Sequence, residues 1–290
     1  MPHLSLRSVV KGAAALATIA SLGAIAWAGV NRAAVRHPHR IVSLNLCADQ
    51  YLLALADRGQ IAGLTRNAAD PAMSAAAVQA RGLHIMGLSA EEILAIDPDL
   101  IVGVPAKRSG IMATLAGRDY RIVDLKPAAS FDDIVAQIRE VAAAIDQVNR
   151  GEALIARMKR ELAGLPRRRG APVAVYYQRR GFMTGAGTLV DDLMSRVGLT
   201  NLAGKLGKPV LSQMSLEQLM AAQPDYLIVE SNADRITDQG TEMLHHPILD
   251  GIPRLRLPQA WTVCGGPAYV LAARSLSQQI TAGPTRISAR

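Results

Sequence analysis

The sequence predicts an α/β fold of two lobes, each with a central parallel sheet, joined by a single long α-helix. Three observations predict it: short apolar runs alternate with helical patterns, one helical pattern in mid-chain is far longer than the others, and one segment occurs twice. Strands that alternate with helices along a chain are typical of parallel sheets covered by helices.

The expected strands are short apolar runs bounded by Gly, Pro or charged residues. Such continuous runs are typical of strands that are buried on both faces of a parallel sheet. The helices between them are one to four turns long, for example at 48–57 and 189–197. The strands are expected at 40–44, 60–64, 99–104, 120–125, 172–177, 226–230 and 261–263.

The longest helical pattern covers residues 131–163. Ser130 and Asp133 have the spacing of a capping box at its start, and apolar residues then recur at steps of three or four. The pattern is interrupted at Gly151 and resumes at Leu154. A continuous helix of this length would span roughly 50 Å, which is more than the diameter of a small domain. We therefore expect one helix to bridge two lobes.

A repeated unit flanks this helix, because residues 89–102 and 215–228 align without a gap. Each copy has the pattern of a capped short helix, a Pro-Asp turn and a buried strand. Duplication of a lobe explains the repeat better than chance. We therefore expect a first lobe at 39–128, a linking helix at 129–165 and a second lobe at 166–290.

The composition is that of a globular protein and argues against nucleic-acid binding. Of the 290 residues, 50% are hydrophobic and 19% are charged, which excludes a disordered chain. The net charge is +8, but residues 1–40 hold five basic and no acidic residues, which leaves +3 for the other 250. A nucleic-acid groove needs clustered basic residues, often with aromatic ones, so we expect no nucleic-acid partner.

The N-terminal segment has the pattern of an export signal. Arg7 and Lys11 precede nineteen uncharged residues at 12–30, which end in small side chains. An uncleaved membrane anchor is the alternative, since nineteen apolar residues are near the minimum for a membrane span. We therefore expect residues 1–38 to be a signal peptide or anchor followed by a linker. The two cysteines, Cys47 and Cys264, do not lie at a lipoprotein position after this stretch.

Several segments in a fixed order resemble one known family. They are RIVSLNLCADQYLLALA, EEILAIDPDLIV, the long mid-chain helix, VYYQRRGFMTGAGTLVDDLMSRVGLTNLAG and SLEQLMAAQPDYLIVE. Together, over residues 39–281, they resemble the periplasmic substrate-binding proteins of ABC importers for vitamin B12 and iron-siderophores. The resemblance implies two α/β lobes joined by one rigid helix, with a ligand cleft between the lobes.

The resemblance also implies a function. A protein of this kind captures a metal-chelate or corrinoid (an iron-siderophore, cobalamin or haem) in the periplasm and delivers it to the permease dimer of an ABC importer. We expect it to be a monomer without a cofactor. We also expect no catalytic activity, because the sequence has no nucleophile elbow, zinc-protease, Cys-x-x-Cys or P-loop motif.

Two residues are implied to dock the permease. Glu91 and Glu217 occupy the same position in the two copies of the repeat, and in the family one Glu on each lobe meets arginines of the permease. Paired carboxylates, one on each lobe, suit a symmetric partner. Each Glu is alternatively an early-helix residue favoured by the helix dipole, and Glu92 is the alternative contact on the first lobe.

Candidate ligand-binding residues follow the predicted strands, because ligands of open α/β sheets bind beyond the carboxyl ends of the strands. Aromatic faces and basic groups among them suit a large, partly apolar ligand that carries carboxylates or phosphate. The basic residues at the strand ends favour an anionic chelate or haem over a neutral ligand. The candidates are Asn45, Cys47, Arg66, Lys107, Tyr177, Arg179, Arg180, Phe182, Ser231, Trp261 and Cys264.

The two cysteines allow two interpretations. Each follows a predicted strand, one in each half of the chain, and disulfides persist in exported proteins. A Cys47–Cys264 bridge that pins the lobes and a pair of independent thiols near the ligand both fit the sequence. The distance between the two Cα atoms decides between them.

Two other functions stay open as alternatives. A related group of binding proteins captures free Zn²⁺ or Mn²⁺ with His and carboxylate ligands, but the six histidines here do not follow predicted strands. The other alternative is a membrane-anchored ligand sensor that takes no part in transport. We expect no metal site within the protein itself.

Overall fold

The computed structural model describes residues 37–115, 117–166, 170–234, 236 and 238–283. The predicted signal peptide or anchor lies almost wholly outside the described residues. Within the described part of the chain, no helix is both long and apolar enough to cross a membrane. Residues from Pro38 onward form one unit, whose internal arrangement is described below.

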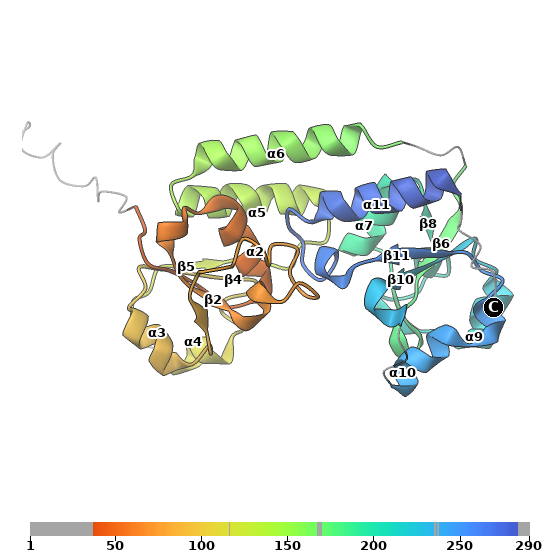
Figure 1. Ribbon diagram of the computed structural model, residues 1–290, viewed down its shortest axis with the longest axis horizontal. Helices are drawn as coiled ribbons and strands as arrows, with labels where there is room; N and C mark the ends of the chain where they lie inside the picture. The colour runs from red at the N-terminus through yellow and green to blue at the C-terminus, as the bar shows by residue number, and fades with distance from the viewer. Residues whose placement is uncertain (1–36, 116, 167–169, 235, 237, 284–290) are drawn as a thin grey trace, which may run out of the picture. The chain divides into compact units, whose positions relative to one another are not determined.

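Two parallel sheets form the centres of the two lobes (Figure 1). The sheet of the first lobe has the strand order β3-β2-β1-β4-β5, and that of the second has the order β11-β10-β6-β8. The first sheet contains β1 (Ile41–Ser43), β2 (Ile61–Thr65), β3 (Ile85–Met86), β4 (Leu100–Gly103) and β5 (Ile122–Asp124). The second contains β6 (Val173–Tyr176), β8 (Thr200–Asn201), β10 (Tyr226–Glu230) and β11 (Arg254–Leu257).

The prediction of an α/β fold with parallel sheets is confirmed, and six of the seven expected strands are present. The seventh, expected at 261–263, is wrong, because its first residue belongs to a 3₁₀ turn at Gln259–Trp261 and the edge strand is β11. In β11, Arg254 and Arg256 alternate with buried leucines, which is an edge-strand pattern that a search for continuous apolar runs misses. A separate antiparallel pair joins β7 (Phe182–Thr184) and β9 (Leu211–Gln213).

The repeat has the same local structure in both lobes. Helices α3 (Ala90–Ile96) and α9 (Leu216–Ala222) begin at Ser89 and Ser215, whose hydroxyls accept hydrogen bonds from the first turn. Both helices end at a residue in the left-handed conformation, with φ of 50° at Asp97 and 46° at Gln223. Each helix then leads into a strand, β4 or β10, so the duplicated segment is a duplicated piece of structure.

The Pro-Asp turn of each repeat is tied to the strand beside it. Asp99 accepts hydrogen bonds from the backbone N–H groups of His39 and Arg40, at 2.8 and 3.0 Å. Asp225 accepts one from the N–H of Val173 at 2.7 Å. The two carboxylates therefore fix the start of β1 against β4 and of β6 against β10, and this equivalence relates the two sheets.

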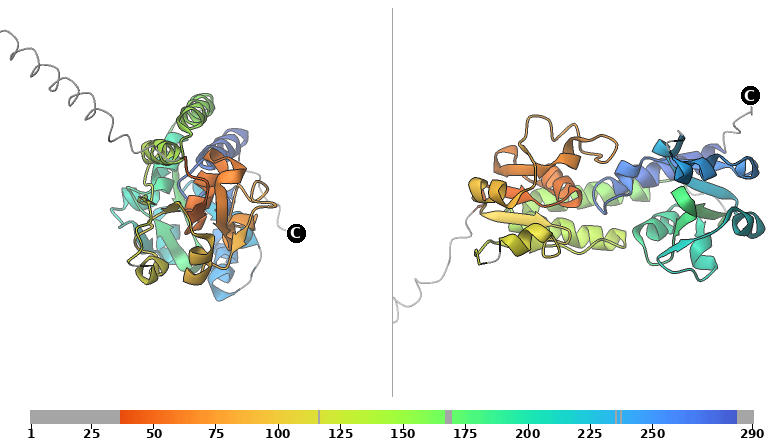
Figure 2. Two further views of the ribbon diagram at one scale, coloured as in Figure 1. Left: turned by 90° about the vertical axis from the view of Figure 1, so that its left-hand side faces the viewer. Right: turned by 90° about the horizontal axis from the view of Figure 1, so that it is seen from below.

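The predicted single linking helix is wrong, because the segment forms two helices, α5 (Phe131–Ala144) and α6 (Val148–Ala163). Asp146 between them has φ of 61°, in the left-handed region that ends a helix. Gly151 allows the two helices to approach closely, since a Cβ atom added there would lie 2.6 Å from that of Ala142. The apolar faces that the sequence shows as one continuous stripe therefore belong to two helices that pack against each other (Figures 1 and 2).

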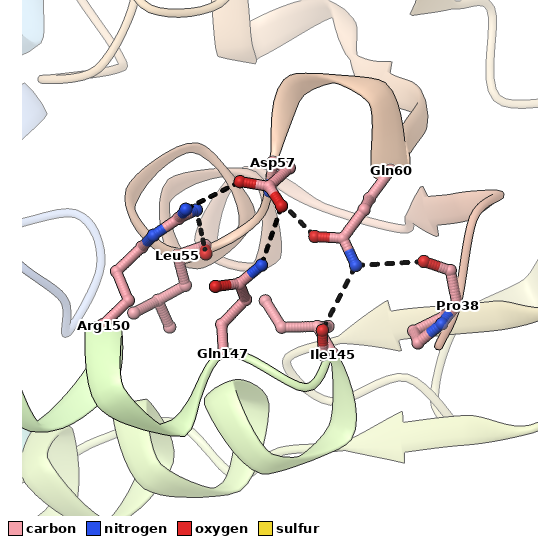
Figure 3. Close-up of polar contacts among 7 residues, drawn as sticks. All are labelled: Pro38, Leu55, Asp57, Gln60, Ile145, Gln147 and Arg150. Atoms are coloured by element: carbon pink, nitrogen blue, oxygen red, sulfur yellow. Dashed lines mark hydrogen bonds and ion pairs between the residues drawn. The ribbon is translucent and has the colours of Figure 1, made fainter. Parts of the chain in front are cut away.

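The turn of this helical hairpin is fastened to the first lobe (Figure 3). Gln60 is buried, and its Nε2 lies within hydrogen-bond distance of the carbonyl oxygens of Pro38 and Ile145, at 3.0 and 3.2 Å. Arg150 donates to a carboxylate oxygen of Asp57 at 2.6 Å. These contacts hold the reversal of the chain between α5 and α6 against the first sheet.

The other end of the hairpin contacts the second lobe. The ring of Phe131 lies 5.6 Å from that of Tyr269, and its backbone N–H donates to Asp192. Arg274 pairs with Glu161 of α6. The contacted helices are α7 (Leu189–Arg196) and α11 (Tyr269–Ala282). Both helices of the hairpin thus contact both lobes, so the link has two helices where one was expected.

The largest apolar core includes residues from both sheets and from the hairpin. Ile41 of β1, Ile228 of β10 and Ile138 of α5 are all fully buried in it. Two smaller clusters lie on the other faces of the sheets. The remaining helices are α2 (Leu46–Leu55), α4 (Gly110–Thr114), α8 (Leu202–Lys205) and α10 (Gln239–Glu242).

Candidate functional site

A disulfide joins the two lobes. Cys47, in the first turn of α2, is bonded to Cys264, which lies in the loop before α11, and their Cα atoms are 5.2 Å apart. Beside it, the hydroxyl of Tyr51 lies 2.7 Å from the carbonyl oxygen of Gly265. The bridge excludes the alternative of two independent thiols. It also fixes the loop after β11 against α2 of the first lobe.

A pocket of about 230 Å³ lies at the carboxyl ends of β6 and β10, where the topology of the sheet predicts a ligand site. Its lining residues all belong to the second lobe. They are Tyr177, Gln178, Arg179, Glu230, Ala233, Thr241, Leu244 and Gln259. Gln259 is only five residues from Cys264, so the segment that forms one wall of the pocket is the segment tied to the first lobe.

Glu230 is the carboxylate in the pocket wall, and two neighbours hold it. The hydroxyl of Tyr176 and the Nε2 of Gln178 both donate to Oε1 of Glu230, each at 3.0 Å. Burial, followed by the negative charge of Glu230, raises the pKa of Tyr176 above its ordinary value. Tyr176 therefore stays protonated and serves as a hydrogen-bond donor to the carboxylate.

Arg179 lines the pocket, and its charge is already paired. Its guanidinium contacts the carboxylate of Asp238, and that carboxylate also accepts a hydrogen bond from the backbone N–H of Thr241. The hydrogen bond from Thr241, with the nearby charge of Arg179, holds the pKa of Asp238 below its ordinary value. Both side chains therefore stay ionised, and their opposite charges nearly cancel.

Tyr177 also belongs to the pocket wall, but its side chain is fully buried. Its hydroxyl donates to the carbonyl oxygen of Met214 at 2.8 Å, and burial raises its pKa to about 12. Arg180 follows with φ of 59° and an exposed side chain, while Phe182 is half-buried at the start of β7. Of the predicted ligand residues, only Tyr177 and Arg179 therefore line this pocket.

The other predicted residues lie at several places. Asn45 caps α2 and donates to the carbonyl oxygen of Val104 at 3.2 Å. Lys107 lies 3.7 Å from Asp124, and Arg66 is exposed. Ser231 and Trp261 are half-buried, and Cys264 is buried in its disulfide.

Three further residues line the pocket but were not predicted from the sequence: Glu230, Thr241 and Gln259. A signal existed for Glu230, because it is an acid at the end of the apolar run 226–229, where strand ends point toward ligands. No comparable pattern marks Thr241 or Gln259. They lie in the connections that follow β10 and β11, and only the tertiary structure brings them to the pocket.

Asp49 is a buried acid that no pattern in the sequence marks. Its carboxylate accepts hydrogen bonds from the backbone N–H and the hydroxyl of Thr65, at 3.1 and 2.5 Å. Burial outweighs these bonds and raises the pKa of Asp49 from 3.8 to about 6. Asp49 lies on α2, two residues from Cys47 of the disulfide.

Glu91 and Glu217 occupy equivalent exposed positions, in the first turns of α3 and α9. The pKa of Glu91 is lowered by its own backbone N–H and then by the hydroxyl of Ser89, and that of Glu217 is lowered by the hydroxyl of Ser215 and then by its own backbone N–H. Both are therefore ionised at neutral pH. Glu92 is used differently, since it accepts a hydrogen bond from the N–H of Leu88 and lies 3.3 Å from His84.

The described residues contain no cluster of three or more His, Cys, Asp or Glu side chains that could hold a metal ion. His84 lies beside Glu92, and His245 contacts the carbonyl oxygen of Ala233 at 2.7 Å. These histidines thus have partners within their own lobes.

Comparison with known proteins agrees with this architecture. The vitamin B12-binding protein of Pectobacterium carotovorum subsp. carotovorum strain PC1 is 28% identical over 207 residues, which cover 68% of this chain and 72% of that protein. The periplasmic heme-binding protein RhuT from Roseiflexus sp. RS-1 is 25% identical with a TM-score of 0.65, over 83% of this chain and 97% of RhuT. The periplasmic heme-binding protein HutB of Vibrio cholerae, at 16% identity, shares the fold with a TM-score of 0.70, over 83% and 98% of the two chains.

The family match covers most of the sequence. Residues 41–256 match the family described as periplasmic binding protein, and this span includes both sheets, the helical hairpin and both copies of the repeat. The chain therefore belongs to the periplasmic binding protein family.

Proposed function

We propose that this protein captures a metal-chelate or corrinoid outside the cytoplasm and delivers it to the permease of an ABC importer. Membership of the family implies an extracytoplasmic location and a role in binding a small ligand. The relatives point to the ligand class, since one is named a vitamin B12-binding protein and another a heme-binding protein.

The observation that carries the proposal is the pocket at the carboxyl ends of β6 and β10. Its volume of about 230 Å³ accommodates part of a large ligand, and the remainder of such a ligand would lie outside it. The segment from Gln259 to Cys264 connects this pocket to the first lobe. A ligand seated there would therefore lie beside a part of the protein that contacts both lobes.

Delivery to a permease is supported by the pair Glu91 and Glu217. They are exposed, ionised and placed identically in the two copies of the repeat, one on each lobe. Glu92 is already engaged by Leu88 and His84, which leaves Glu91 as the carboxylate offered to a partner on the first lobe. A permease built from two similar subunits would meet one such carboxylate with each of its halves.

Ligand binding is tested by mass spectrometry under native conditions on protein purified from its own host. Absorbance titrations with cobalamin, haem and a ferric hydroxamate then identify the ligand class. Binding of one of these at a one-to-one ratio supports the proposal. Binding of free Zn²⁺ or Mn²⁺ and of none of the chelates would contradict it and favour the metal-ion alternative.

Delivery is tested separately by reversing both charges. We expect the double variant Glu91→Arg, Glu217→Arg to lose uptake of the ligand while its affinity for the ligand is unchanged. Glu140→Arg is the matched control, since Glu140 is an exposed glutamate of α5 outside the repeat. Normal uptake by the double variant would contradict permease docking and favour a sensor that takes no part in transport.

A further inference from the structure

We infer that Glu230 selects ligands that present neutral hydrogen-bond donors, such as the primary amides of a corrinoid, over ligands that present carboxylates, such as haem. This inference rests on the proposed function and specifies the ligand class of the same pocket. It runs against the expectation from sequence that basic strand ends favour an anionic chelate.

The two oxygens of the Glu230 carboxylate have different surroundings. Oε1 of Glu230 accepts two hydrogen bonds, from Tyr176 and Gln178. Across the part of the chain that the structure describes, Oε2 has no hydrogen-bond or ion-pair partner. A carboxylate oxygen has room for further donors, so Oε2 is an acceptor that remains available in the pocket wall.

The Glu230 carboxylate is held in place by its two hydrogen-bond donors. Tyr176 is buried, and its hydroxyl also lies 3.4 Å from that of Thr262, while Gln178 follows directly after β6. Two donors on one oxygen fix the orientation of the whole carboxylate. Oε2 therefore has a defined position, and an acceptor that is held in advance contributes more to specificity than a mobile one.

The charged side chains among the described residues that line the pocket are Arg179 and Glu230. Arg179 is the cation among the described lining residues, and its charge is matched by Asp238. Glu230 therefore contributes a negative charge that no described side chain of the pocket offsets. A ligand carboxylate brought next to Glu230 would be repelled by its charge and would lose water of hydration.

The remaining polar lining is neutral. Gln178, Thr241 and Gln259 supply amide and hydroxyl groups, and Leu244 and Ala233 supply apolar surface. Such a wall suits a ligand with an apolar body and neutral polar substituents. A corrinoid carries several primary amides at its edge, whereas haem carries two carboxylates.

The test is the nearly isosteric substitution Glu230→Gln, probed with cyanocobalamin and with hemin. The Gln oxygen can still accept from Tyr176 and Gln178, which places its NH₂ group where Oε2 stood. The substitution thus replaces an acceptor by a donor without emptying the site. We expect the wild-type protein to bind cyanocobalamin more tightly than hemin, and the variant to shift the ratio of the two dissociation constants toward hemin by about tenfold.

Glu242→Gln is the matched control, because Glu242 is an exposed glutamate of α10 that does not line the pocket. Thermal unfolding of both variants verifies that they fold like the wild type. A preference of the wild type for hemin, or an equal ratio in the Glu230 and Glu242 variants, would overturn the role of Glu230 and leave the proposed function standing. If the wild type bound neither probe nor a ferric hydroxamate, both the inference and the proposed function would be overturned.

Discussion

Removal of the Cys47–Cys264 bridge should lower the free energy of unfolding by several kcal/mol. The two residues are 217 positions apart, and the entropy of closing a loop of that length in the unfolded chain corresponds to about 5 kcal/mol. The double variant Cys47→Ser, Cys264→Ser should still fold, because Tyr51, Phe131 and the helical hairpin continue to join the lobes.

The measurement is urea unfolding followed by far-ultraviolet circular dichroism, with near-ultraviolet spectra to verify that the variant is folded. With a slope of about 2–3 kcal/mol per molar urea, we expect the midpoint to fall by about 2 M. Wild-type protein that has been reduced and alkylated should behave like the double variant, because both lack the cross-link. A loss below about 1 kcal/mol would refute the reasoning, since the bridge would then not restrict the unfolded chain.

Three further predictions follow from buried contacts. Asp49→Asn should flatten the pH dependence of stability between about pH 4 and 6. In the wild type, Asp49 of the folded state keeps a proton in this window that the unfolded chain has lost. The free energy of unfolding therefore falls by about 3 kcal/mol as the pH rises through the window. Urea midpoints measured at several pH values would show this fall. Gly151→Ala should destabilise the hairpin by about 1–3 kcal/mol, because the new methyl group overlaps that of Ala142. The second substitution Ala142→Gly should restore most of the lost thermal stability, because it removes the overlapping methyl group. Gln60→Ala should lower the free energy of unfolding by about 1–3 kcal/mol, because Gln60 is buried. Arg150→Ala should lower it by less than about 1 kcal/mol, because the ion pair of Arg150 is exposed. Equal losses for the two variants in urea unfolding would contradict this prediction.

Local patterns account for what could be predicted about the fold. The caps at Ser89 and Ser215, the Pro-Asp turns and the buried strands after them are decided by residues within a few positions of each other. The prediction of one long helix failed because the apolar stripe of a single helix and the facing stripes of two antiparallel helices have the same spacing. The reversal depends on the conformation of Asp146 and on the close approach at Gly151, and neither changes the periodicity.

By itself the sequence determined the alternation of strands and helices, the duplicated unit and the two glutamates that it presents on the surface. Only the tertiary structure decided that the cysteines are bonded, that the linking segment folds back, and that, among the described residues that line the pocket, Arg179 is paired with Asp238 while Glu230 has no cationic partner. The division has a physical reason. Caps and strand patterns depend on neighbours along the chain. The partners of Cys47, Arg179 and Glu230, in contrast, are 217, 59 and up to 54 positions away in the sequence. Such pairs form only once the sheets and helices have packed.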